Sequence, residues 1–106
     1  MTEKRERFPS KHEIPMPVRV SFQVGDEPEL ATGWIARLSL AGVDIETLHP
    51  SPVGSRIVFH AVLDPAGTEI LAFQGRVQWV VGGRVGVQFM ELGARETHAI
   101  LQAMRT

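Results

Sequence analysis

The sequence contains no cysteine and no tyrosine, and both absences narrow what the chain can be. Without cysteine, neither a disulfide bond nor a thiolate-ligated metal site can form. Aromatic residues make up only 7% of the chain, so few rings are present to stack on the bases of single-stranded nucleic acid. The four histidines lack the spacing of metal ligands; they are His12, His49, His60 and His98. We therefore expect no metal site.

Long runs of one residue type are also missing. No apolar stretch approaches the ~18 residues that a membrane helix needs, and no apolar segment of the secretory kind follows the charged residues 1–7. The net charge is −1 without a block of one sign, which argues against binding to nucleic acid polymers. These features predict a cytoplasmic domain that does not insert into a membrane.

Catalytic signatures are absent as well. The chain has no GxSxG or HExxH motif and no glycine loop that would cradle a phosphate. Ser39 has no evident base partner in the sequence. We expect no enzyme activity.

The residues that are present suffice for one folded domain. The chain has 106 residues, of which 43% are hydrophobic. Pro9, Pro15 and Pro17 rule out a continuous helix near the N-terminus, and the charged residues around them offer no apolar face. We expect a flexible basic N-terminal arm over residues 1–17 and the folded domain over residues 18–106. Residues 1–19 carry a net charge of +2 and the remaining residues −3.

From residue 18 onward, apolar and polar residues alternate as in β-strands. Strand character covers residues 18–24, 31–40, 43–46, 56–63, 69–81 and 85–89. Uninterrupted alternation puts Trp34, Ala36 and Leu38 on one side of the strand predicted at residues 31–40. Residues 56–63 are apolar on both faces, Gly75 suggests a bulge, and Gly82-Gly83 predicts a tight hairpin.

After Gly93 the apolar spacing becomes helical. Thr97, Ile100, Leu101 and Met104 form the stripe of a short amphipathic helix. Six short strands favour closure into a barrel, because closure removes exposed strand edges. The predicted fold is therefore all-β with one helix: a six-stranded antiparallel β-barrel plus a short C-terminal α-helix. The helix is expected to cover an open end and bury Ile100, Leu101 and Met104.

Two segments match motifs of a known family. Residues 37–42 read Arg-Leu-Ser-Leu-Ala-Gly, which keeps the serine and glycine of the pattern (D/N)xSxxG. Residues 7–11 read Arg-Phe-Pro-Ser-Lys, close to the pattern RxxxR. The strands G-x-V-x-W at residues 75–79 and G-V-x-F at residues 86–89 follow in the family's order. In these features, over residues 4–104, the chain resembles PilZ domains.

The resemblance implies a function in bacterial signalling. Many PilZ domains bind the second messenger cyclic di-GMP, using an arginine-rich arm and the turn after the second strand. Carried over to this chain, the ligand-binding set is Arg5, Arg7, Lys11, Arg37, Ser39 and Gly42. The arm arginines would contact phosphate or stack on guanine, and the turn would shape the base site. Apart from this ligand, no cofactor is implied.

The chain departs from the family pattern at two of these positions. Arg37 replaces the aspartate or asparagine of the turn, and Lys11 replaces an arginine. A guanidinium can contact phosphate, or O6 and N7 of guanine, but it cannot accept from the N–H edge of the base. Each loss is worth ~1–3 kcal/mol of binding. The alternative is thus an adaptor that binds no nucleotide and regulates motility or polarity through protein–protein contacts.

Structural roles compete with the binding roles. Ser39 and Gly42 can simply form a turn, and Arg37 can pair with Asp44 or Glu46 on the next strand as a surface ion pair of little energetic value. Trp34 and Trp79 are expected in the core or the barrel wall. If either is exposed, it becomes the first candidate for a protein-contact patch. The partner's identity and the choice between monomer and homodimer stay open.

Overall fold

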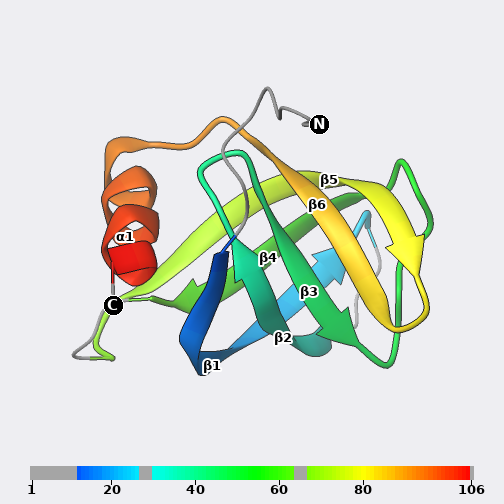
Figure 1. Cartoon of the computed structure of the whole chain (residues 1–106). Coiled ribbons are helices and arrows are strands. Elements are labelled where there is room, and N and C mark those ends of the chain that lie inside the picture. Colours follow the sequence, from blue (N-terminus) through cyan, green and yellow to red (C-terminus); the bar gives the residue numbers. More distant parts are fainter. Residues whose placement is uncertain (1–11, 27–29, 64–66, 106) are drawn as a thin grey trace, which may run out of the picture.

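The computed structural model of the chain is a closed antiparallel barrel of six strands with one helix beside it (Figure 1). It describes residues 12–26, 30–63 and 67–105. The elements are β1 (His12–Val24), β2 (Ala31–Leu38), β3 (Gly42–Thr47), β4 (Arg56–Val62), β5 (Ile70–Val81), β6 (Arg84–Met90) and α1 (Ala94–Arg105). Around the barrel the order is β1-β2-β3-β6-β5-β4. The predicted fold class is confirmed.

Alternate side chains of the strands fill the barrel interior. The rings of Phe59 and Phe73 stack with their centroids 5.0 Å apart, and Phe89 packs against both. On β4 only one face is buried, through Ile57, Phe59 and Ala61. The expectation that β4 is covered on both faces is wrong, since the opposite face carries the exposed Arg56 and His60 beside valines that are only half-buried.

The alternation along β2 changes side at Ala36. The register between β2 and β3 shifts between Ile35 and Arg37, which marks an extra residue, a β-bulge. Ile35 and Leu38 consequently both face the core, whereas Trp34 is 47% exposed. The prediction that Trp34 lies in the core or the barrel wall, which rested on the usual burial of tryptophan, is wrong because the bulge leaves Trp34 on the outer face of β2 while Leu38 faces the core.

A second bulge lies on β5 at Gln78, where the register with β6 shifts between Val77 and Trp79. Trp79 is half-buried, and its indole ring covers Gly86 so closely that a Cβ there would collide with it. The predicted wall position of Trp79 is confirmed. At Gly75 the register is regular instead of bulged, and the glycine permits close approach of β6.

The first strand begins at His12, earlier than the alternation at Val18 indicates. Its register with β2 is irregular between Glu13 and Val18. Pro15 and Pro17 fall in this stretch, where the ladder does not depend on their missing N–H groups. As a result, His12 pairs with Leu38 and Glu13 with Arg37.

The helix packs against β1 and β5 (Figure 1). Ala99, Ile100 and Ala103 are buried and Met104 is half-buried, whereas Leu101 is 40% exposed. The prediction is therefore right for Ile100 and wrong for Leu101. The contact face is rotated from the expected one, because Ala99 and Ala103 are buried beside Ile100 in place of Leu101. The Gly82-Gly83 hairpin is as predicted, with Val81 opposite Arg84.

Candidate functional site

The turn between β2 and β3 contains the serine and glycine of the family motif. Ser39 is fully buried, and its N–H donates to the carbonyl of Gly42 at 2.9 Å. Its hydroxyl oxygen accepts from the N–H groups of Ala41 at 3.1 Å and Gly42 at 3.2 Å. These bonds fix the path of the backbone from β2 into β3, so the serine hydroxyl is used inside the turn.

Gly42 has a steric role in the same turn. Its Cα faces β6, and a Cβ atom there would collide with the carbonyl oxygen of Val87. Only a residue without a side chain lets the two strands approach this closely. The motif glycine thus holds the turn against the barrel.

Arg37 forms an ion pair with Asp44 across the β2–β3 ladder. The Nε atom of Arg37 donates to Oδ2 of Asp44 at 3.0 Å. The Arg37 side chain is 46% exposed, but that of Asp44 is only 1% exposed. Asp44, one of the two predicted partners, is confirmed. The pair is not the surface pair that was expected, because one of its charges is buried and depends on its partners.

Asp44 is buried although it points to the outer face of the barrel. The register places Arg37 on one side of it and Gly86 on the other, and Trp79 is the next residue in this row. The indole of Trp79 covers Gly86, so an arginine and a tryptophan flank the carboxylate. The sequence gives no direct signal of this burial, since Asp44 occupies a position that alternation assigns to solvent.

The N-terminal segment enters the barrel beside this turn. His12 pairs with Leu38, the residue that directly precedes Ser39, and Glu13 pairs with Arg37. Of the predicted ligand-binding residues, the structure thus brings together Arg37, Ser39 and Gly42. Arg5, Arg7 and Lys11 lie outside the described residues, and the chain that follows them runs next to the turn.

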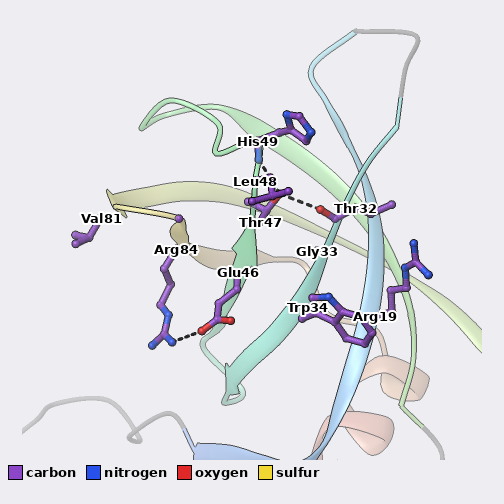
Figure 2. A pocket seen from close by; sticks show the side chains of 11 residues that line it. Arg19, Thr32, Gly33, Trp34, Glu46, Thr47, Leu48, His49, Val81 and Arg84 are labelled. Carbon is purple, nitrogen blue, oxygen red and sulfur yellow. Dashed lines mark hydrogen bonds and ion pairs between the residues drawn. The ribbon is translucent and has the colours of Figure 1, made fainter.

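An open hollow of ≈ 790 Å³ lies near the other ends of β2 and β3 (Figure 2). Trp34 and Arg19 line one side of it, and Glu46 and Arg84 line the other. Gly33 pairs with Thr47 here, five residues along β2 from the Leu38 end, or about 17 Å at ~3.3 Å per residue. The sequence did not predict this hollow, because Trp34, which lines it, was expected in the core or the barrel wall.

In the part of the chain that the structure describes, no three histidine, aspartate or glutamate side chains gather closely enough to hold a metal ion. The single helix found there is too short and too polar to span a bilayer.

Comparison with known proteins assigns the family. The PilZ domain model matches residues 2–105, nearly the whole chain. The chain belongs to the PilZ domain family. No curated protein sequence matches it significantly.

Solved structures of other PilZ proteins share the fold of this chain. The PilZ domain of CeSA from a cellulose-synthesizing bacterium aligns with a TM-score of 0.66 at 20% identity, covering 86% of this chain and 92% of that one. The PilZ domain of YcgR from Escherichia coli, solved with c-di-GMP, gives 0.71 at 16% identity, with coverages of 96% and 93%. The Bacillus subtilis inhibitor of motility MotI (DgrA) gives 0.76 at 15% identity. This chain is covered to 96% and spans about half (52%) of that protein.

Proposed function

We propose that this PilZ domain is a regulatory module that binds cyclic di-GMP between its N-terminal arm and the turn of residues 37–42. The observation that carries the proposal is the pairing of His12 with Leu38 and of Glu13 with Arg37. Lys11 is joined directly to His12, so the basic arm enters the barrel beside the motif turn. A relative of the same fold, YcgR, was solved with c-di-GMP.

In this proposal the ligand contacts come mainly from cations. Arg5, Arg7 and Lys11 address the two phosphates or stack on guanine. The guanidinium of Arg37, oriented by Asp44, contacts a phosphate or O6 and N7 of a guanine. Ser39 and Gly42 keep the turn in the shape that the ligand meets.

Calorimetric titration of the full chain with cyclic di-GMP, at low and at physiological salt, tests the proposal. Saturating heat at micromolar ligand is expected, and higher salt should weaken it because phosphate contacts dominate. Arg7→Ala and Arg37→Ala should each reduce affinity about tenfold. Arg56→Ala is the matched control, since this exposed arginine lies on β4, three strands from β3 around the barrel.

The second candidate is an adaptor that binds no nucleotide. It is favoured by the Arg37–Asp44 pair, because the motif's acceptor is missing and the residue in its place is already bound to a buried carboxylate. A folded sample that gives no heat with cyclic di-GMP near a millimolar would support this candidate and overturn the first.

A further inference from the structure

A row of outward-facing side chains crosses five strands of the barrel at the hollow. Arg19 on β1 pairs with Trp34 on β2, and Trp34 pairs with Glu46 on β3. Glu46 in turn pairs with Arg84 on β6, which lies opposite Val81 on β5. Cross-strand neighbours on one face lie within contact distance. The row is therefore a continuous surface, which we call the Trp34 row.

Large apolar side chains gather at this row. Trp34 is 47% exposed, Val81 69% and Leu48 92%, and all three line the same hollow (Figure 2). Exposed apolar side chains that cluster around a concavity mark interaction sites, whereas isolated ones are common on any surface. Tryptophan and arginine are also the residues that most often dominate binding energy at protein interfaces.

The charges around the hollow are biased toward the positive sign. The guanidinium of Arg19 lies over the ring of Trp34, 5.9 Å from its centroid, and Arg84 is bound to Glu46. The lining residues thus include two arginines and one carboxylate. Residues 20–106 as a whole carry a net charge of −3. A positive groove on a negative body attracts acidic partners and repels basic ones.

The topology limits how a partner can bind here. The barrel is closed, and β2, β3 and β6 each have a neighbour on both sides. A partner cannot add a strand at this place, so it must bind through side chains. The far edge of the hollow at Gly33 is about 17 Å along β2 from Leu38, whereas Trp34 is only about 10 Å from Arg37, at ~3.3 Å per strand residue. The hollow therefore lies beside the proposed nucleotide site and shares no lining residue with it.

We propose that the Trp34 row docks an acidic segment of a partner protein that carries a large apolar side chain. That side chain packs on Trp34 and Leu48, and carboxylates on either side of it pair with Arg19 and Arg84. Arg84 can exchange from Glu46 to a partner carboxylate because both of these side chains are half-exposed. The surface does not depend on whether the turn binds nucleotide.

A phage-displayed library of random 12-residue peptides, selected on the immobilised full chain, tests this. The enriched sequences should carry aspartate or glutamate around a leucine, phenylalanine or tryptophan. The best peptide is then synthesised with a fluorophore and titrated by anisotropy. Trp34→Ala and Arg19→Glu should each weaken its binding at least about tenfold, the size expected of a hot-spot residue. Equal melting temperatures of the variants show that the fold is intact.

Matched controls separate this surface from the rest of the barrel. Val53→Ala removes an exposed aliphatic side chain, 63% accessible, that does not line the hollow, and Arg56→Glu reverses an exposed arginine on β4. Both should leave peptide affinity unchanged. Trp34→Ala should leave any cyclic di-GMP heat unchanged, so failure of one proposal is distinguishable from failure of the other.

Several results would overturn the docking proposal. They are a neutral or basic consensus, no enrichment at all, or an acidic peptide whose affinity survives both Trp34→Ala and Arg19→Glu. Sedimentation of the wild type gives another test. A dimer that Trp34→Ala dissociates would assign the surface to a second copy of the chain and rule out the acidic partner.

Discussion

The carboxylate of Asp44 lies on the outer face of β3, and only 1% of its side chain is exposed. Burying a carboxylate costs free energy unless hydrogen bonds and an opposite charge compensate for the lost hydration. Asp44→Asn keeps the shape and weakens the bond to Arg37, so it should lower the free energy of unfolding by about 1–3 kcal/mol. Urea denaturation measures this difference.

Glu46 provides the matched control for Asp44. It sits two residues further along β3 and pairs with Arg84, but its side chain is 52% exposed. Glu46→Gln should therefore change the free energy of unfolding by no more than about 0.5 kcal/mol. Equal effects of the two substitutions would show that the burial of Asp44 has no energetic consequence.

Arg37 determines how the family motif can be restored in this chain. Arg37→Asp would place a second carboxylate beside Asp44, and two adjacent anions repel. Arg37→Asn supplies the same acceptor without charge. Both variants also carry Lys11→Arg. The asparagine variant should then bind cyclic di-GMP at least about tenfold more tightly than the parent chain. The aspartate variant should melt at a lower temperature than the asparagine variant.

Because aspartate and asparagine have the same size, the comparison isolates the charge. Calorimetry and thermal melting of the parent chain and the two variants provide the data. An aspartate variant as stable as the asparagine variant would contradict the role given to Asp44.

Among the elements, the β2–β3 turn is the most tightly constrained. A Cβ at Gly42 meets the backbone carbonyl of Val87, which cannot move without separating β3 from β6. Gly42→Ala should therefore cost about 1–3 kcal/mol of unfolding free energy. Gly93→Ala is the control, because the added methyl meets only the flexible end of the Glu96 side chain. A Gly42→Ala protein as stable as the control would show that the strands can separate easily here.

The helix offers a second pair of substitutions. Ile100 is completely buried, whereas Leu101 is 40% exposed. Ile100→Ala should lower the free energy of unfolding by about 2–4 kcal/mol, and Leu101→Ala by less than about 1 kcal/mol. Urea denaturation of both variants checks which face of the helix contacts the barrel. A larger effect at Leu101 would mean that the face expected from the apolar spacing is the one that packs.

Bulges mark the limit of what the sequence could predict about the strands. Period-two alternation was sufficient to place the six strands and the Gly82-Gly83 hairpin, because side-chain period and turn chemistry are local properties. The extra residues at Ala36 and Gln78 depend on how neighbouring strands pair. No local pattern reports such a pairing, so alternation put Trp34 on the wrong side.

The candidate site, like the strands, could be predicted from the sequence only in part. Motif spacing located the turn of residues 37–42, and the acidic residues of the next strand gave Asp44 or Glu46 as possible partners of Arg37. The burial of Asp44 could not be read from the sequence, because it follows from Trp79 lying over Gly86 two strands away. The Trp34 row was equally hidden, since its members come from five strands and meet only through the register.

At the scale of the whole molecule, the two proposed surfaces lie near opposite ends of β2 and β3. The motif turn follows Leu38, and the hollow begins near Gly33. Closure of the barrel holds the two regions at a fixed separation, because every strand is bonded on both sides. The proposed nucleotide region and the proposed docking region thus occupy different parts of one closed barrel.

The most direct test of this account is a titration of the 15N-labelled full chain with cyclic di-GMP, followed by amide chemical shifts. Saturable shifts are expected at Ala41 and Gly42 in the turn and at His12 and Glu13 beside it. The amides of Gly33 and of residues 47 and 83, which line the hollow, should stay in place. Shifts centred on the hollow, or none up to a millimolar ligand concentration, would contradict the claim that the arm and the turn form the nucleotide site.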